Sequence, residues 1–358
     1  MDFPIYKTKR EGLSLGFNVN DPVERFEYFQ AKAGTEIEAI KEYIDEGHTF
    51  VAYMLAKKSA GKGTYSKMFE EIVGSDRVAT FSIGDLIRQT EKDVADPGKR
   101  GELVEYLKSN YRGFNSVEEI MEAFDNRSTS KLLPTEFIMA LVKREISRIG
   151  DKAVFIDGFP RGLDQISYSL YFREIMRLRD DPDFFVLIDV PESVIDARMK
   201  ARVVCPICKT SRNVTLLPTK FPAYDKANDR FYLLCDNSEC TGHGVQEMVK
   251  KEGDELGIEA IRDRVNTDGE LMNRAFMLQG IPKVLLRNSV PVDQANESVD
   301  DYEITPEFEY SFNDIENRVE MEEKPWVIKS DDGIDSYSLY AAPVVLAMIM
   351  QIKKILLG

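Results

Sequence analysis

The chain contains very few of the residues on which several classes of protein depend. It has only two histidines and one tryptophan in 358 residues, which leaves no Ser-His-Asp constellation. His48 precedes an apolar run and is expected at the surface. The apolar run from Val344 to Met350 is far too short to span a bilayer, and the N-terminal residues 1–12 include no apolar signal-peptide core. We therefore expect a cytoplasmic protein without a membrane partner.

Positive charge is also in deficit. The sequence has 47 Lys and Arg residues against 62 Asp and Glu residues, a net charge of -15. Its overall field repels nucleic acid and anionic membranes, so a phosphate ligand would have to be captured in a local basic cleft. The 43% hydrophobic content is enough for a large core. We expect a globular monomer that binds small molecules and no nucleic acid.

The four cysteines lie only between positions 205 and 240. In a reducing compartment this clustering favours a metal site over disulfides. Cys205 and Cys208 form a Cys-x-x-Cys knuckle, while Cys235 and Cys240 form a longer one. Two such knuckles are typical of a closed, four-cysteine structural zinc site. His243 is an alternative fourth ligand, but Cys240 is favoured.

Residues 51–66 are the most informative stretch. An apolar run is followed by a Gly-Lys-x-Thr segment and then by a helical pattern. In a phosphate-binding loop of this kind, backbone N–H groups face a polyphosphate, Lys62 reaches the β and γ oxygens, and a hydroxyl can hold Mg²⁺. Ala56 and Ser59 stand where glycine is usual, and Lys57 and Lys58 make the loop unusually basic.

Further strand-to-turn segments follow at 78–85, 153–161 and 184–191, alternating with amphipathic helices at 63–73, 134–149 and 192–202. Two short helices, 21–34 and 35–46, precede the first strand. This alternation predicts an α/β fold of the P-loop NTPase type, a parallel β-sheet flanked by helices with ligands at the carboxyl ends of the strands.

Five separated motifs, the phosphate-binding loop among them, occur in the order expected of one family. Residues 81–88 are similar to its Ser-Thr-Gly-Asp-x-x-Arg motif, and 131–143 to the helix that closes its monophosphate insert. Its most specific motif is matched by Asp157-Gly158-Phe159-Pro160-Arg161 with Gln165. A lid is flanked by the segments Asp189 to Arg202 and Arg262 to Arg264. Through most of residues 48–265 the chain resembles the adenylate kinase family of nucleoside monophosphate kinases.

The resemblance implies the reaction ATP + AMP = 2 ADP with Mg²⁺, and a structural Zn²⁺ in the lid. Charge neutralisation by Mg²⁺, Lys and Arg is the main chemistry of phosphoryl transfer. The implied catalytic residues are Lys62, Arg88, Asp157, Arg161, Arg202 and Arg264. The implied ATP-binding residues are Ser59, Ala60, Gly61, Lys62, Gly63, Thr64 and Arg198. The implied AMP-binding residues are Ile83, Gly84, Arg88, Leu133, Gly158, Arg161 and Gln165.

The motifs divide the chain into six parts. We expect a helical extension at 1–47, core with the phosphate-binding loop at 48–83, a monophosphate-binding insert at 84–133, core at 134–202, a zinc-binding lid at 203–261, and core again at 262–358. The last part includes an acidic insert, 285–330, and a C-terminal helix. Within the last part, 262–358, we expect 293–324 to be an exposed loop or hairpin. We expect 325–328 to be a last core strand and 330–333 to be a turn under the donor adenine.

The sequence leaves other functions open. Ile83 replaces a usual threonine, and the segment between Arg88 and Lys131 is long, with a Pro97-Gly98 turn and an extra helix at 117–124. A UMP/CMP-type or broad nucleoside monophosphate kinase is therefore an alternative. Ala56 and Ser59 raise another, a catalytically weak nucleotide sensor or adaptor. A zinc-ribbon nucleic-acid binder is disfavoured by the acidic charge.

Overall fold

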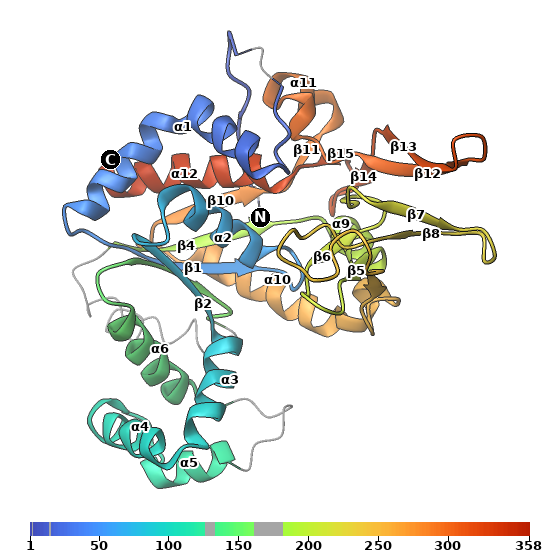
Figure 1. The fold of residues 1–358 in the computed structure, drawn as a ribbon. Coiled ribbons are helices and arrows are strands. Elements are labelled where there is room, and N and C mark those ends of the chain that lie inside the picture. The colour runs from blue at the N-terminus through green and yellow to red at the C-terminus, as the bar shows by residue number, and fades with distance from the viewer. Residues whose placement is uncertain (2, 14–15, 126–132, 161–181) are drawn as a thin grey trace.

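A parallel five-stranded sheet forms the centre of the protein (Figure 1). The computed structural model describes residues 1–358 except 2, 14–15, 126–132 and 161–181. The strand order is β10-β4-β1-β3-β2, and every neighbouring pair is parallel. The strands are β1 (Val51–Ala56), β2 (Val78–Ser82), β3 (Ala153–Asp157), β4 (Asp183–Asp189) and β10 (Lys283–Arg287). The predicted α/β fold with a parallel sheet is confirmed.

Helices cover both faces of this sheet because its strands are apolar on both sides. All six residues of β1 are buried. Ala52 and Met54 pack into one apolar layer, whereas Tyr53 and Leu55 pack into the opposite one. The first layer includes α1 (Pro22–Asp45), α2 (Lys62–Val73) and α12 (Ala341–Leu357), and the second includes α6 (Thr135–Ile149) and α10 (Arg262–Met277). This two-sided burial is what a central parallel strand requires.

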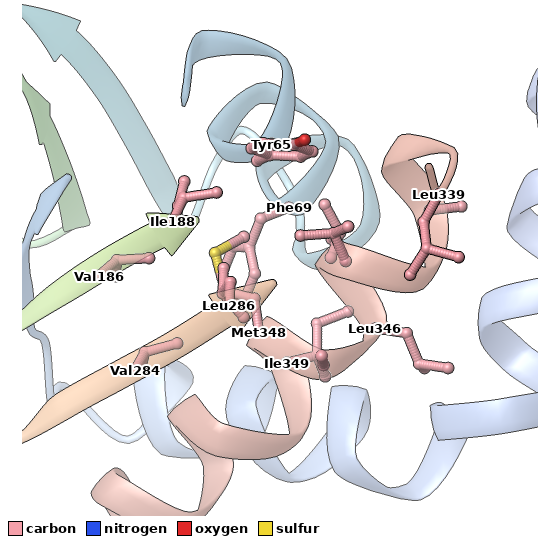
Figure 2. Close-up of a cluster of buried hydrophobic side chains, with 14 of the residues drawn as sticks. Tyr65, Phe69, Val186, Ile188, Val284, Leu286, Leu339, Leu346, Met348 and Ile349 are labelled. Carbon is pink, nitrogen blue, oxygen red and sulfur yellow. The ribbon is translucent and has the colours of Figure 1, made fainter. Parts of the chain in front are cut away.

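The C-terminal helix α12 lies deep in the first layer. Met348 and Ile349 are fully buried and lie near Phe69 of α2 and Leu286 of β10 (Figure 2). Burying such side chains stabilises the fold by about 1.5–3 kcal/mol each relative to leaving them exposed. Although α12 is strongly apolar, no helix in the described part of the chain is long and apolar enough to cross a membrane.

The N-terminal extension is held to the core by α1. Asp21 caps this helix, accepting hydrogen bonds from Val23 N at 3.0 Å and Glu24 N at 3.3 Å. The two helices predicted here form one element that is kinked at Ala33. Directly before the kink, the buried Lys32 pairs with Glu303 at 2.7 Å. The extension is thus tied to the C-terminal half of the chain.

Three helices follow β2: α3 (Ile83–Val94), α4 (Pro97–Asn110) and α5 (Val117–Asp125). The extra helix predicted at 117–124 is confirmed. The turn predicted at Pro97-Gly98 is wrong, because Pro97 instead opens α4, and Asp96 caps it by accepting from Gly98 N at 2.8 Å. Proline suits the first helical position, where its missing N–H leaves no hydrogen bond unmade.

The segment 325–328 was expected to supply the last core strand, and this expectation is wrong. Residues of this segment enter β14 (Val327–Lys329), which pairs antiparallel with β15 (Asp335–Ser338) in a small sheet with β11 (Ser289–Pro291). Val327 and Lys329 are exposed and only Ile328 is buried. A strand with one solvated face cannot occupy a sheet covered on both sides, and β10 takes that place.

Two hairpins extend side by side from the core (Figure 1). One is β7 (Pro222–Asp225) with β8 (Arg230–Leu233), and the other is β12 (Glu307–Asn313) with β13 (Arg318–Lys324). Tyr224 stacks on Phe312 at 4.7 Å between ring centroids, and Phe231 stacks on Tyr310 at 5.5 Å. Residues 307–324 of the acidic segment therefore form a hairpin, as predicted, with one edge against the cysteine-bearing region. The rest of the predicted loop, 293–306, is not an exposed loop, because it includes short helices and Val299 and Glu303 are buried.

Smaller elements complete the fold. The cysteine region also contains a sheet of β5 (Arg202–Val204), β6 (Ser211–Asn213) and β9 (Val249–Lys250). It follows α9 (Glu192–Lys200) and leads through η1 (Gly257–Ile261) into α10, while α11 (Val292–Ser298) and η2 (Asp301–Glu303) lie between β11 and β12.

Candidate functional site

The loop between β1 and α2 adopts a conformation in which two residues have left-handed backbone angles. Gly61, the residue before α2, has φ of 96°, and Ser59 has φ of 66°. Glycine takes such angles without strain, whereas a side-chain-bearing residue does so at a cost of about 1–2 kcal/mol. Ser59 thus adopts a glycine-like conformation, which explains why glycine is usual at this position. Ala60 is fully buried between these two residues.

Lys62 begins α2 and is oriented back across the loop. Its Nζ donates to the carbonyl oxygen of Ala56 at 3.1 Å and lies 3.6 Å from a carboxylate oxygen of Asp157. Gly63 and the exposed Thr64 follow in the first helical turn. The Thr64 N–H donates to the Gly61 carbonyl oxygen at 2.8 Å. The first N–H groups of a helix precede its regular hydrogen bonds and its dipole is positive there, so this end of α2 favours an anion.

The ends of three parallel strands bring the first motifs together. Asp157 is the last residue of β3 and stands in register with Met54 of β1 and Ser82 of β2. Ile83 begins α3 directly after Ser82, and a Cβ atom added at Gly158 would lie 3.9 Å from the Ile83 Cβ atom. Ile83, Gly84 and Gly158 therefore lie at the same sheet edge as Asp157.

Arg88 projects from α3 and is 65% exposed. Its guanidinium pairs with Asp85, whose carboxylate accepts from the Ser82 hydroxyl at 2.6 Å. The Ser82 hydroxyl, followed by Arg88, holds the pKa of Asp85 below its ordinary value. Leu133 is buried in the apolar layer that contains α6. The remaining expected acceptor residues, Arg161 and Gln165, lie outside the described residues.

Each arginine expected at the lid hinges has a polar partner. Arg202, at the start of β5, forms a two-point pair with Asp254, with Nη2 2.7 Å from one carboxylate oxygen. Arg264, in the first turn of α10, lies 2.7 Å from Asp268.

Arg198 has neutral partners. Its Nη2 donates to Asn288 Oδ1 at 3.2 Å and to Ser338 Oγ at 3.4 Å, joining α9 to the small sheet. Asn288 is fully buried and also donates to the carbonyl oxygen of Leu339 at 2.9 Å.

The extra lysine at position 57 takes part in an ion-pair cluster. Its Nζ lies 2.5 Å from Asp331 and 3.1 Å from Glu192. Asp331 also accepts from the backbone N–H of Glu192 at 2.7 Å, and Glu192 pairs with Arg262. Burial lowers the pKa of Lys57, but Asp331 and Glu192 outweigh it and leave the pKa raised. Lys57 therefore stays charged and anchors the 330–333 turn to the loop.

The four cysteine sulfurs lie within 4.8 Å of one another. The Sγ atoms of Cys205 and Cys240 are 3.9 Å apart, and those of Cys208 and Cys235 are 3.6 Å apart. A tetrahedral zinc–thiolate site requires sulfur separations of about 3.8 Å, so these residues fit that ion. Among the described residues, Cys240 lies in one cluster with the other three cysteines, whereas the ring of His243 packs on Phe221.

The environment of these thiols differs. The Thr210 hydroxyl beside Cys208 lowers the pKa of that thiol to about 6, whereas burial raises the pKa of Cys235 to about 12. A bound cation favours thiolate at every ligand.

Sequence reasoning missed the acidic partners of these cations. Asp254 and Asp268 belong to no motif, and Glu192 lies within the 189–202 motif without an assigned role. Nothing in the local sequence of Asp254 or Glu192 indicates contacts with arginines that lie in other elements. For Asp331 the sequence predicts only a turn, 330–333. The four-residue spacing of Arg264 and Asp268, which places both side chains on one face of a helix, is a local signal for such a pair.

Comparisons with known proteins agree with the site. A protein named adenylate kinase from Thermotoga petrophila is 31% identical over 174 residues, which are 48% of this chain and 67% of that relative. Another from Thermotoga neapolitana is 32% identical over the same shares. A third, from Staphylococcus epidermidis, is 30% identical over 169 residues, 47% of this chain and 66% of that relative. The chain belongs to the adenylate kinase family.

Within this family the protein is a nucleoside monophosphate kinase. A scan against models of protein families gives no match. Membership in the adenylate kinase family therefore rests on the relatives, while the loop, the strand edge and the cysteine cluster are consistent with it.

Proposed function

We propose that the protein catalyses reversible transfer of the γ-phosphoryl group of ATP to AMP, giving two molecules of ADP. The bond between the γ-phosphorus and the β–γ bridging oxygen breaks, and a bond forms to an oxygen of the AMP phosphate. The observation that carries this proposal is the pairing of Lys62 with Asp157 at the carboxyl edge of a parallel sheet. Such an edge is where ligands bind in sheets of this kind.

The donor half of the proposed site is the loop from Ser59 to Thr64 with Lys62. Lys62 would leave Ala56 and Asp157 to bind the β and γ oxygens, and Arg198 would lie against the adenine. Thr64 and Asp157 are the residues that would hold the Mg²⁺ of the nucleotide, directly or through its waters. Bound there, Mg²⁺ supplies neutralisation of phosphate charge.

The acceptor half consists of Arg88 with Ile83, Gly84, Leu133 and Gly158, together with Arg161 and Gln165 on the resemblance alone. Arg88 is exposed, and its ion pair among the described residues is with Asp85, three residues earlier, so a phosphate can displace Asp85 at little cost. Arg202 and Arg264 would close on the transferred group, and closure would exclude water.

The zinc proposal is separate from the chemistry. Zn²⁺ on the four cysteines would have no open position for substrate, so its contribution is to the folding of the lid.

A panel of acceptors tests the proposal. The purified protein is given MgATP with AMP, CMP, UMP or GMP, and ADP formation is followed by a coupled assay. We expect AMP to give the highest kcat/KM. A preference for UMP or CMP would support the alternative acceptor range, for which Ile83 in place of a hydroxyl residue is the motivating feature. Tight nucleotide binding without turnover on any acceptor would indicate a sensor and overturn the proposal.

A further inference from the structure

One buried carboxylate near the phosphate-binding loop has no role so far. Asp268 lies on α10, one helical turn after Arg264, and is only 6% exposed. Its carboxylate lies 2.7 Å from the Arg264 guanidinium. Because α10 packs on β1, this carboxylate is brought close to the loop that follows the strand.

The charges around Asp268 come from two different parts of the site. Burial raises the pKa of Asp268, and Arg264, Lys62 and the backbone N–H of Lys58 act against burial to favour the ionised form. Arg264 belongs to the helix that leaves the lid, whereas Lys58 and Lys62 belong to the phosphate-binding loop. The same carboxylate thus faces both.

A purely structural explanation is weak. An exposed ion pair four residues apart on a helix contributes about 0.3–0.5 kcal/mol, whereas taking a carboxylate out of water costs several kcal/mol before its partners compensate. An apolar residue would stabilise this part of α10 more simply. A buried carboxylate here is better explained by what it orients.

We propose that Asp268 is a positioning residue for phosphoryl transfer, which holds the Arg264 guanidinium in a fixed orientation beside the phosphate-binding loop. This inference rests on the proposed function, because it requires that Arg264 act on the transferred phosphoryl group. A guanidinium that is already oriented loses less side-chain freedom when the phosphoryl group arrives. Its effect therefore falls on kcat more than on substrate binding.

The test is Asp268→Asn, which keeps the size of the side chain and removes its charge. Arg264 is 32% exposed, so its guanidinium stays partly solvated when the Asp268 charge is removed, and we expect D268N to fold. We expect kcat for ATP with AMP to fall about tenfold or more, with both KM values within about threefold. Unchanged or increased kcat would overturn the proposal.

Asp196→Asn is the matched control. Asp196 pairs with Lys200 four residues on in α9 and also accepts from a backbone N–H, that of Ile258, at 3.0 Å. Like Asp268, it has a cation four residues away on its own helix and a backbone N–H as partners, but it lies away from the phosphate-binding loop. We expect D196N to keep kcat within about twofold. An equal loss in both variants would indicate a general structural effect and would contradict a positioning role.

A double-mutant cycle identifies the residue through which Asp268 acts. We expect R264A to lower kcat strongly and D268N to change kcat by less than about twofold in the R264A background. If the double variant instead lost kcat by the product of the two single-variant factors, Asp268 would not act through Arg264. If D268N fails to fold, Asp268→Glu keeps the charge but moves it: a lower kcat with unchanged KM supports the proposal, and a wild-type kcat overturns it.

The two hypotheses fail in different ways. A wild-type protein that phosphorylates no nucleoside monophosphate would refute the proposed function and this inference with it. An active wild type with a fully active D268N would refute the inference alone.

Discussion

Lys62 and Asp157 face each other across 3.6 Å, although one begins α2 and the other ends β3. The fold brings them together because β1 and β3 are adjacent parallel strands whose carboxyl ends lie at one edge of the sheet. The pair is 15% and 26% exposed, so both groups remain accessible to a ligand. A polyphosphate with its cation can bind both residues at once.

The first prediction concerns Lys62. Replacing it with alanine should lower kcat/KM by about a thousandfold, because the loop then lacks the positive charge that binds the transferred phosphate. The free energy of unfolding should change by less than about 1 kcal/mol, since the lysine is partly exposed. Lys67→Ala, an exposed lysine on the same helix, is the control and should stay active. An active K62A protein would contradict the assigned role.

The second prediction concerns Ser59. Ser59→Gly should raise the free energy of unfolding by about 0.5–1 kcal/mol, because glycine accepts φ of 66° without strain. Lys209 has φ of 62° in the cysteine region, and Lys209→Gly should give a similar gain. Denaturant unfolding measures both. We expect only S59G to alter the KM for ATP, and a loss of stability in S59G would show that the serine is not strained.

The third prediction concerns the cysteine cluster. Protein purified without added zinc should contain about one zinc per chain, as four thiolates close the site. Cys240→Ser should lose the metal and lower the melting temperature, whereas His243→Ala should keep it, because His243 packs on Phe221 instead. Elemental analysis of the zinc content of both variants decides whether Cys240 or His243 is the fourth ligand. Zinc lost in H243A and kept in C240S would reverse the assignment.

The fourth prediction concerns the acidic hairpin. Tyr310 and Phe312 stack on the rings of the β7–β8 hairpin, and the Tyr310 hydroxyl donates to the carbonyl oxygen of Val214. Replacing both rings by serine should speed hydrogen exchange of β7 and β8 amides, because each aromatic pair contributes about 0.5–1.5 kcal/mol beyond its buried area. Ser311→Ala, on the exposed side of β12, should leave exchange unchanged. Equal exchange in all three proteins would mean that the hairpin does not brace this region.

The sequence was sufficient for the sheet and for the edge that carries the site. Apolar runs such as Val51–Ala56 predict strands that are buried on both faces. The parallel topology then brings the residues at the ends of these runs, such as Asp157, to one edge of the sheet. Asp21 followed by Pro22 is also a local pattern typical of a helix start, and α1 begins there.

Other features depend on contacts between distant segments. The pairing of Lys57 with Asp331, or of Arg202 with Asp254, has no local sequence pattern. Residues 325–328 are as apolar as a core strand, but Val327 is exposed, and β10 is the strand that pairs with the edge of β4. Such outcomes are decided by tertiary packing, which local propensity does not encode.

The most direct test follows both nucleotides at once. ³¹P NMR of the protein with Mg²⁺, ATP and AMP should show ATP and AMP disappearing at equal rates and two ADP appearing for each pair. With AMP omitted, ATP should persist. Release of inorganic phosphate at the same rate without AMP, or no change in either nucleotide, would contradict the account of a two-nucleotide site built around Lys62 and Asp157.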